Sequence, residues 1–565
     1  MNLSSFSRPV WLASCFCLLL LPACRDSAKG KLETAIVREP IVPIVEPTVV
    51  PIVEPDAPAE VQRDASDEFF DNGTIPQIKI VLKESQAKKL REDARHYAKC
   101  KLIENGETTY TDVAIKLKGA AGSFRELDDR PAFTLNMDKH VKGQTFHALD
   151  KFHLNNSVQD ESYLSEWLCS DLCRDANVPA TRVTHARVWL NDRDLGLYVL
   201  KEGFDTTFLK RHFADSTGNL YDGGFVQDID VDLEKDGGKG PDDHSDLHSL
   251  KAACLEPDPE KRWPAIEEQL DVDAFLSFMA IELMTAHWDG YTQNKNNYRI
   301  YFDPANAKAR FLPHGMDQMF GDPGFPILEY SEPIVASAVM HNPEWRKRYR
   351  ERVTELLPLF EPQRLHKKLD TVVARLQPVV DKFGDEFAKS HADRVRELKE
   401  RIAEREPNLR EQLQNGDPTP QEFNADGLAE IADWFPAQET DDTKIEEVEI
   451  DGQKRYSIQV GESGQCVASW RRKVLLAKGR YRVEARLRTE AVVAREDDSG
   501  TGAGLRISGG KRDNKLVGDS DWKTVTYDFE VLEEVRDVLL VAELRATAGR
   551  MWLEPVARLM KRESN

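Results

Sequence analysis

Two polar loops in the middle of the chain carry the residues best suited to chemistry. The segment HWDGYTQNKNNYRIYFD, residues 287–303, contains Asp289 and, five residues later, Asn294. The segment FLPHGMDQMFGD, residues 311–322, contains Asp317 shortly before a Phe-Gly pair. Phosphoryl transfer needs a carboxylate near the attacking hydroxyl and oxygen ligands for a divalent cation. This spacing therefore predicts Asp289 as the group that receives or orients the hydroxyl proton, and Asp317 as a metal ligand.

The elements expected around these loops would place both carboxylates at the ends of secondary structure. Asp289 follows DVDAFLSFMAIELMTAHW, residues 271–288, a strongly apolar helix with Asp271 or Asp273 available to cap it. Asp317 follows the strand-like RFLP, residues 310–313. Each carboxylate is thus expected at the start of a loop.

A glycine-containing turn lies upstream, in LKGAAGSFRELDDRPAF. Gly119 and Gly122 stand between two predicted strands, where backbone N–H groups can approach phosphate oxygens. Basic residues surround the turn, namely Lys118, Arg125 and Arg130. A hairpin turn that merely needs glycines is the simpler interpretation of this motif alone.

Each motif taken singly also has a structural explanation. Asp289 can cap a helix, the neighbouring asparagines can build turns, and a helical Glu such as Glu166 is usually solvated. The order of the parts favours chemistry: glycine turn, basic residue, Glu-bearing helix, hairpin, apolar helix, Asp–Asn loop, strand and Asp. Protein kinases have this order.

The composition of the whole chain limits the classes of function. A chain of 565 residues is too long to fold around one ordinary hydrophobic core, which predicts two to three folded units. The net charge of −21 argues against non-specific nucleic-acid binding, and no nucleic-acid partner is expected. The cysteines after Cys24 show no paired spacing, and Cys169 and Cys173 are expected to be buried apolar residues.

The N-terminal residues are typical of an export signal. Residues 1–24 carry a short apolar run that ends in Leu-Pro-Ala-Cys, similar to the lipobox of bacterial lipoproteins with Cys24 as the lipidated residue. Plain secretory cleavage near Ala23 is the alternative. Residues 25–68 are rich in Pro and predict an extended spacer. The expected location is the bacterial cell envelope, as a membrane-anchored lipoprotein, or the exterior.

Two folded regions follow. Residues 69–412 mix strand and helix patterns, whereas residues 425–562 show short alternating strands after a Gly/Pro/Asn-rich boundary. The predicted class is α+β, with an all-β sandwich at the C-terminal end. Tryptophans of that sandwich either stack on sugar rings, which makes a glycan a candidate ligand, or fill its core; they are Trp470, Trp522 and Trp552.

Several blocks together resemble the CotH kinase family, over roughly residues 75 to 400. They include LDKFHLNNSVQDESYLSEWL, ARVWLNDRDLGLYVLKEGFDTTFL and the two loops described first. The resemblance implies an atypical protein-kinase-like fold, with an N-lobe sheet and a helical C-lobe. It also implies transfer of the ATP γ-phosphate to Ser or Thr of protein substrates, with Mg²⁺ or Mn²⁺.

The resemblance also implies roles for individual residues. Asp289 matches the family's catalytic Asp, and Asp317 matches its metal-binding Asp. The second metal ligand is either Asn294, by kinase spacing, or one of the pair Asn296 and Asn297. The nucleotide-binding residues would be Lys118, Gly119, Gly122, Arg130, Glu166 and Glu202, with Glu202 at the hinge and Glu166 beside the phosphate-binding cation.

One departure from the family pattern bears on activity. Arg130 stands where the family usually has Lys, and an Arg is not a neutral replacement for an ammonium group. The alternative to a kinase is therefore a catalytically inactive CotH-like protein that acts as a surface binding or adhesion protein.

Overall fold

The computed structural model describes residues 63–71, 73–120, 122–440, 442–495, 501–512 and 514–562. The chain divides into two units, Met1–Glu60 and Val61–Asn565, and the described residues all belong to the second. The predicted signal segment, the lipidation site Cys24 and nearly all of the predicted spacer lie outside them. No helix in these described ranges is both long enough and apolar enough to span a membrane.

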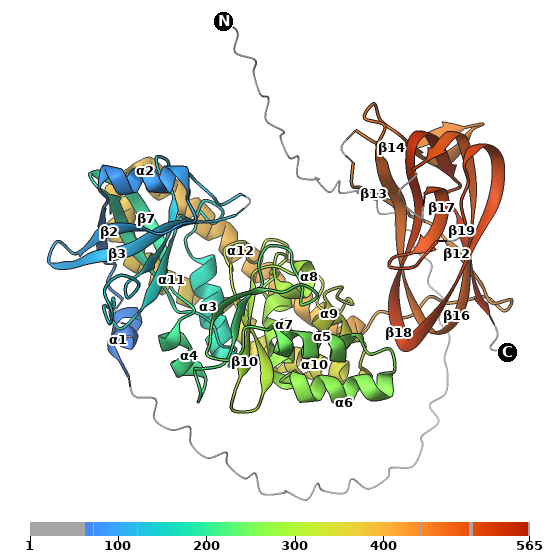
Figure 1. Ribbon diagram of the computed structural model, residues 1–565. Coiled ribbons are helices and arrows are strands. Elements are labelled where there is room, and N and C mark those ends of the chain that lie inside the picture. Colours follow the sequence, from blue (N-terminus) through green and yellow to red (C-terminus); the bar gives the residue numbers. More distant parts are fainter. Residues whose placement is uncertain are drawn as a thin grey trace, which may run out of the picture. The chain divides into compact units, whose positions relative to one another are not determined.

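A closed barrel forms the first part of the described chain, with the strand order β1-β2-β3-β4-β5-β7-β6 (Figure 1). Closure depends on β1 pairing with β6, the one parallel pairing within the barrel. Alternate residues of β2 are buried, so one side of each strand fills the interior with apolar side chains. The strands are β1 (Gln77–Val81), β2 (Ala98–Glu104), β3 (Thr108–Lys118), β4 (Ala132–Asn136), β5 (Lys151–Asn155), β6 (Val183–Leu190) and β7 (Arg193–Glu202).

The predicted hairpin is the β6–β7 pair, which turns at Asn191 with a positive φ of 53°. The predicted glycine turn lies between β3 and β4. Short helices cover the barrel or follow it, and α3 contains Glu166. These helices are α1 (Ala65–Asp71), α2 (Glu84–Glu92), α3 (Ser165–Asp175) and α4 (Thr206–His212).

A second sheet, in the order β11-β10-β8-β9, carries the two polar loops. The apolar helix α7 (Val272–Met284) precedes the first loop, and the Asp271 side chain caps it by accepting a hydrogen bond from Ala274 N, as predicted. The strands of this sheet are β8 (Leu220–Asp222), β9 (Glu234–Gly237), β10 (Tyr298–Asp303) and β11 (Lys308–Pro313).

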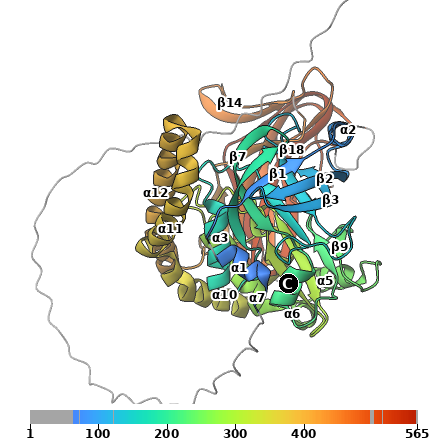
Figure 2. The same cartoon turned by 90° about the vertical axis from the view of Figure 1, so that its left-hand side faces the viewer.

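Helices enclose this region and share one apolar core with it. The long helices α11 and α12 run side by side (Figure 2). Cys169 and Cys173 are buried in the same core, as expected. The remaining helical elements are α5 (Ser245–Leu255), α6 (Pro259–Gln269), α8 (Tyr291–Asn294), α9 (Ile334–Met340), α10 (Pro343–Leu356), η1 (Leu357–Phe360), α11 (Pro362–Val380), η2 (Asp381–Phe383) and α12 (Asp385–Asn415).

The described residues after α12 form strands only, in a sheet of order β12-β19-β16-β18-β15-β14. Trp470 is buried in the apolar core of these strands, as the core interpretation expects. Trp552 is buried outside that core, beneath Arg488 and Arg550, and Trp522 is half-buried. These strands are β12 (Leu428–Ile431), β13 (Phe435–Gln438), β14 (Lys444–Ile450), β15 (Gln453–Gln459), β16 (Cys466–Ala494), β17 (Gly502–Ile507), β18 (Gly518–Leu553) and β19 (Ala557–Arg562).

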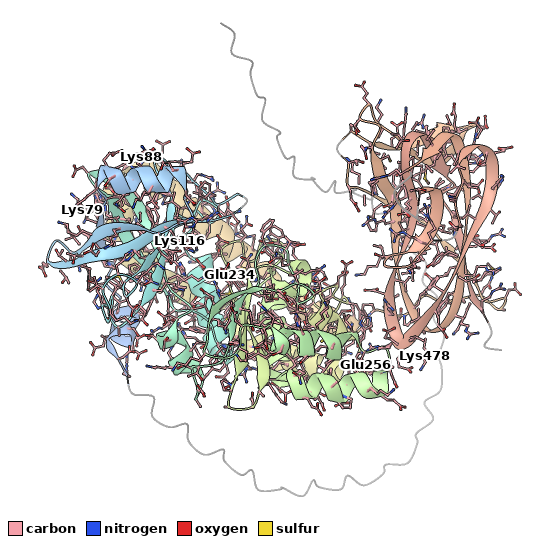
Figure 3. All side chains as sticks on the ribbon, viewed as in Figure 1. Lys79, Lys88, Lys116, Glu234, Glu256 and Lys478 are labelled. Atoms are coloured by element: carbon pink, nitrogen blue, oxygen red, sulfur yellow. The ribbon has the colours of Figure 1, made fainter. Side chains whose placement is uncertain are left out.

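Charged side chains, which make up 31% of the sequence, cover the outside of the described parts because burial of an unpaired charge is costly (Figure 3). Lys88, Glu234 and Lys478 are examples that stand exposed. The mixed α+β class is confirmed, whereas the kinase-like lobes and the sandwich stay predictions.

Candidate functional site

A polar cavity of about 400 Å³ brings together most of the residues selected from the sequence. Its volume lies within the range of small-molecule sites, roughly 300–1,000 Å³. The barrel contributes β3, β5 and β7, and the second sheet contributes the loops around β10 and β11. The predicted site residues that line it are Lys118, Gly119, Glu166, Asp289, Asn294, Asn297 and Asp317.

Asp289 is fixed by the asparagines that follow it. Asn294 Nδ2 donates to Asp289 Oδ1 at 2.7 Å, and Asn297 Nδ2 donates to Oδ2 at 2.8 Å. Asn296 Nδ2 lies 3.1 Å from both carboxylate oxygens. The amide oxygens of these three residues are therefore left for other ligands, and the carboxylate is oriented before any substrate binds.

The loop that holds Asp289 is itself supported by the buried Glu282 of α7. Its carboxylate accepts hydrogen bonds from Tyr291 N, at 3.1 Å, and from Thr292 N and Oγ1, at 2.9 and 2.6 Å. Burial raises the pKa of the Glu282 carboxyl to about 7. His287 Nδ1 lies 3.7 Å from the same carboxylate, and burial lowers the pKa of this imidazole to about 4, so it is neutral at pH 7.

Asp317 lines the cavity. Among the described residues, none donates a hydrogen bond to its carboxylate or forms an ion pair with it. Burial, together with repulsion from Glu166 and Asp160, raises the pKa of Asp317 to about 7. The charges of Lys118 and Lys201 compensate that of the carboxylate only in part. A divalent cation would supply the rest.

The donors around Asp317 fit Mg²⁺ or Mn²⁺ bound with a nucleotide. Mg²⁺ in phosphotransferases takes one or two carboxylates and completes its shell with substrate phosphates and water. Asn297 Oδ1 faces Gly315, where an added Cβ would lie 2.2 Å from it, so this oxygen is directed at the loop that leads to Asp317. The described ranges hold no cluster of three His, Cys, Asp or Glu side chains suited to a metal.

A chain of buried polar contacts forms the cationic side of the cavity. Lys201 Nζ lies 2.5 Å from Glu166 Oε1, and both side chains are almost fully buried. Asn155 links this pair to Lys118, since it donates to Glu166 Oε2 and accepts from Lys118 Nζ, each at 2.5 Å. His314 Nδ1 lies 3.0 Å from Lys201 Nζ.

The charges of these buried side chains shift one another's pKa values. Burial, reinforced by the charge of Lys201, lowers the pKa of Lys118 to about 8. Burial alone would raise the pKa of Glu166, but the ammonium groups of Lys201 and Lys118 hold it below its ordinary value. The cavity thus presents fixed positive charge, which suits the phosphates of a nucleotide.

Arg130 does not lie in the cavity, contrary to the expectation that it replaces the family's Lys. Its guanidinium donates to Tyr163 Oη at 2.8 Å and to the Leu197 carbonyl at 2.6 Å. It also packs against the rings of Tyr163 and Tyr198. The cation that pairs with Glu166 is Lys201 rather than Arg130. Glu166 thus lies beside a cation, as expected, but beside a different residue from the one selected.

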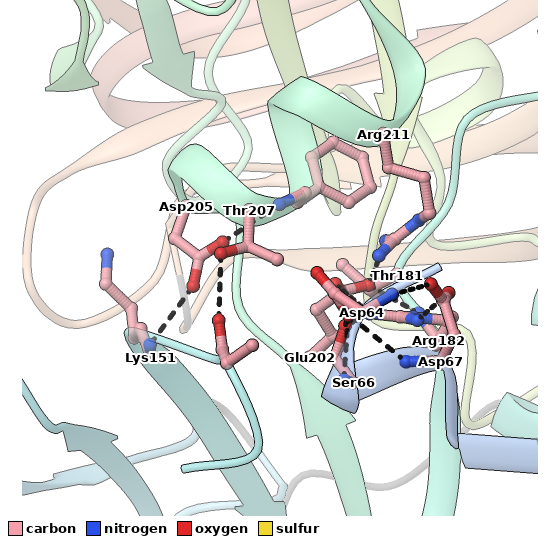
Figure 4. A network of polar contacts seen from close by, with 12 residues as sticks. Asp64, Ser66, Asp67, Lys151, Thr181, Arg182, Glu202, Asp205, Thr207 and Arg211 are labelled. Carbon is pink, nitrogen blue, oxygen red and sulfur yellow. Dashed lines mark hydrogen bonds and ion pairs between the residues drawn. The ribbon is translucent and has the colours of Figure 1, made fainter. Parts of the chain in front are cut away.

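Glu202 and Gly122 also lie outside the residues that line the cavity. Glu202 points to the other side of β7, where its carboxylate pairs with Arg182, at 3.0 Å, and with Arg211 (Figure 4). Gly122 has a positive φ of 82°, and an added Cβ would lie 2.8 Å from Gln159 Nε2. A nucleotide-binding role for Arg130, Glu202 or Gly122 has no support in this geometry.

Sequence reasoning missed the residues that complete the cationic side. Lys201 directly precedes Glu202 in the strand, and alternation along β7 was the signal that could have found it: Leu200 and Glu202 face one side, Lys201 the other. Asn155 and His314 gave no comparable signal.

The comparisons with known proteins bear on the family of the chain. The family model described as CotH kinase protein matches residues 115–409. Invasin CotH2 of Rhizopus delemar is 23% identical over 51% of this chain and 54% of its own length. Invasin CotH7 of the same organism is 27% identical over 32% of each chain. Inner spore coat protein H of Bacillus subtilis is 22% identical over 44% of this chain and 74% of its own. The chain spans about a third to a half of the length of the two invasins.

Solved structures give only weak likenesses. The Helicobacter pylori proinflammatory kinase CtkA has a TM-score of 0.26 at 10% identity, over 57% of this chain and 92% of that one. The module TmCBM61, solved with β-1,4-galactotriose, has a TM-score of 0.18 at 15% identity, over 23% of this chain and 88% of its own. Scores this low do not establish a shared fold.

Proposed function

This chain belongs to the CotH kinase protein family, whose model matches residues 115–409, and we propose that it transfers the γ-phosphate of ATP to Ser or Thr hydroxyls of proteins. One observation carries the proposal: Asp289 and Asp317 line the same cavity as the buried Lys201–Glu166 ion pair. A proton acceptor, a metal ligand and a phosphate-binding cation are the protein groups that this reaction uses.

Each residue then has a role that its surroundings support. Asp289, oriented by three amides, would accept the proton of the attacking hydroxyl. Asp317 and an amide oxygen of Asn294 or Asn297 would hold Mg²⁺ or Mn²⁺, which when bound neutralises charge on the phosphates. Lys201 and Lys118 would bind phosphate oxygens. The body would be a kinase-like fold of two lobes, followed by a β-sandwich.

The proposed place of action is the cell envelope or the exterior. Two matched relatives are named invasins and one a spore coat protein. With the signal-like residues 1–24 and lipidation at Cys24, the protein would be exported and anchored to a membrane. Its substrates would then be envelope or extracellular proteins.

The test measures label transfer from γ-labelled ATP to a Ser-rich acceptor, with Mg²⁺ or Mn²⁺. We expect Asp289→Asn and Asp317→Asn each to lower the rate by at least about 100-fold, because each removes a charge that acts on the transition state. Asp451→Asn is the matched control, since Asp451 is an exposed turn residue with a positive φ of 53° that Asn tolerates. Equal rates for all variants would refute the proposal.

The second candidate is a surface binding protein without catalysis, which the invasin names of the relatives favour. Thermal unfolding with ATP and Mg²⁺ separates the two. A kinase site should raise the melting temperature, and Asp317→Asn should abolish the rise. Absence of any rise in the unmodified chain would favour the binding protein.

Glycan binding by the C-terminal strands is a separate proposal. Of the three tryptophans considered, only Trp522 is more than slightly accessible, and Arg455 and Arg486 lie over its ring at 5.0 and 6.0 Å. Affinity electrophoresis in polysaccharide gels should show retardation that Trp522→Ala removes. Migration unchanged by polysaccharide would refute it.

A further inference from the structure

Three large apolar side chains stand exposed at the edge of the cavity. Phe225, Val226 and Trp288 line it with 59%, 47% and 48% of their surface accessible, and together they form the apolar rim. Among the described residues, no aromatic ring or cation packs on the Phe225 or Trp288 ring, and none accepts a hydrogen bond from the Trp288 indole N–H. Single exposed apolar residues need no explanation, but a group of them beside a site marks a surface where a partner packs.

The loop that presents Phe225 and Val226 has a fixed shape. Gly223 packs so closely on the Tyr298 ring that an added Cβ would lie 2.4 Å from it, and Tyr298 Oη donates to the Gln227 carbonyl at 2.9 Å. Val226 has a φ of 51°, a conformation that β-branched residues rarely adopt. Strain of this kind persists only where the surrounding contacts enforce it, and it is typical of binding sites. The loop therefore holds its apolar side chains in place before a substrate binds.

The same loop is joined to the segment that carries Asp289. The buried Asp228 carboxylate accepts a hydrogen bond from Tyr291 Oη at 3.0 Å, and Tyr291 begins α8, two residues after Asp289. Trp288 directly precedes Asp289 in the chain. The apolar rim and the proposed catalytic carboxylate are thus positioned by connected parts of the fold.

The acceptor substrate, rather than the nucleotide, is the molecule that fits the apolar rim. The phosphates of ATP are expected at Lys118 and Lys201, whereas Asp289 would take the proton of the attacking hydroxyl. Because Trp288 adjoins Asp289, the rim lies on the acceptor's side of the site. A lipid surface is a poorer occupant, since Asp222 and Asp289 line the same cavity and the chain carries a net charge of −21, which an anionic membrane would repel.

We propose that the apolar rim selects protein substrates that carry a large apolar side chain within about two residues of the acceptor Ser or Thr; this rests on the proposed kinase function. That side chain packs on Phe225, Val226 and Trp288 while the hydroxyl lies at Asp289. Burial of apolar surface on both partners favours the contact. A polar side chain in the same position would lose its hydration without gaining a hydrogen-bond partner.

The test measures kcat/KM of the full chain for peptides with a single Ser, using labelled ATP and Mg²⁺. One Leu is moved through the positions on either side of the Ser, and a peptide with Gln at all of these positions is the reference. We expect at least one Leu position to raise kcat/KM by at least about tenfold, because apolar contacts discriminate between substrates to this extent. The gain should lie in KM, since the contact is the same in the ground state and the transition state.

Variants of the rim show whether these residues cause the preference. Phe225→Ser and Trp288→Ala should each bring the ratio of the two kcat/KM values closer to one, whereas Phe225→Leu should keep the preference. Phe435→Ser is the matched control, because Phe435 of β13 is 46% exposed and does not line the cavity. The ratio does not depend on how much of the protein is folded, so partial unfolding cannot mimic its loss.

Three results would overturn the inference alone. They are equal kcat/KM for the Leu and Gln peptides, a Leu preference that Phe225→Ser and Trp288→Ala leave intact, and a smaller thermal shift by ATP and Mg²⁺ in Phe225→Ser, which would assign the rim to the nucleotide. Sedimentation with vesicles of phosphatidylglycerol and phosphatidylcholine that Phe225→Ser abolishes would assign the rim to a membrane instead. No transfer to any peptide would refute the kinase function as well.

Discussion

Lys201 and Glu166 form a buried ion pair. Their Nζ–Oε1 distance is 2.5 Å, and neither side chain is more than slightly accessible. A buried pair adds little net stability, but removal of one partner leaves an uncompensated charge. The pair therefore fixes the position of the cation rather than the stability of the fold.

Lys201→Met should for this reason lower both the stability of the fold and the affinity for nucleotide, and the two effects can be separated. We expect a loss of roughly 3–5 kcal/mol in the free energy of unfolding, because the buried Glu166 charge loses its ion-pair partner and keeps only the Asn155 hydrogen bond and the charge of Lys118. Adding Glu166→Gln should recover part of that loss without restoring the thermal shift by ATP and Mg²⁺. Urea unfolding and nucleotide-dependent melting check the two effects. A double variant that binds ATP normally would contradict the role of Lys201.

Glu282 predicts a pH dependence with a definite sign. Burial raises the pKa of its carboxyl from 4.5 to about 7, so the folded state holds this proton more tightly than the unfolded state does. The contribution of Glu282 to stability is then largest below about pH 4.5 and declines as the pH rises to about 7, by on the order of 3 kcal/mol.

Glu282→Gln removes this titration. The excess stability of the unmodified chain over the variant should be larger at pH 5 than at pH 8. Urea unfolding at both values measures the difference. The same excess at both would show that Glu282 does not titrate on folding.

Sequence reasoning at the residue scale found the carboxylates but not the cation. Asp289 and Asp317 could be chosen because each follows a recognisable helix or strand. Arg130 lies outside the cavity because its side chain is satisfied locally, by Tyr163 and the Leu197 carbonyl. Alternation along β7 separates Lys201 from Leu200 and Glu202, but only the packing of β7 against α3 shows that the face of Lys201 is the one that meets Glu166.

At the scale of elements, Arg405 connects α12 to the end of α7 and to the segment that follows Asp317. Arg405 is fully buried, and its guanidinium donates to the carbonyls of Leu283 and Met284 at the end of α7, at 2.7 and 3.0 Å. It also donates to the carbonyls of Pro323 and Phe325, which follow Asp317. One side chain thus satisfies the helix end before Asp289 and the loop after Asp317.

Arg405→Met should accordingly destabilise the fold and disturb the site. The Leu283 and Phe325 carbonyls keep a second donor, from Ala286 N and Gln412 Nε2, whereas the carbonyls of Met284 and Pro323 would lose theirs. Each buried carbonyl left without its donor costs about 1–3 kcal/mol, so we expect a loss of at least about 2 kcal/mol. Arg396→Met on the same helix is the control, because Arg396 is exposed. Chemical unfolding of both variants measures this. Equal stability for the two would show that water replaces the missing donor.

Most helices and strands could be predicted from the sequence, but the pairing of distant strands could not. Apolar spacing predicted α3 and α7, and the turn at Asn191 predicted the β6–β7 hairpin. Closure of the barrel joins β1 to β6, so that Gln77 lies beside Arg187. Such distant partners leave no local pattern, because register follows from packing of the whole barrel.

At the scale of the whole molecule, the chemistry is confined to one stretch of chain. The cavity is lined by residues between Lys118 and Gln318, and the family match ends at residue 409, inside α12. Since α12 ends at Asn415, the strands that follow contribute no residue to the cavity.

A chain that ends at Asn415 should therefore keep the nucleotide site. We expect ATP with Mg²⁺ to raise its melting temperature by about as much as that of the full chain, because linkage depends on affinity and ligand concentration. Circular dichroism first establishes that the shortened chain is folded, and Asp317→Asn in both lengths is the control that removes the shift. A folded chain ending at Asn415 without any nucleotide-dependent shift would show that the C-terminal strands are needed to form the site.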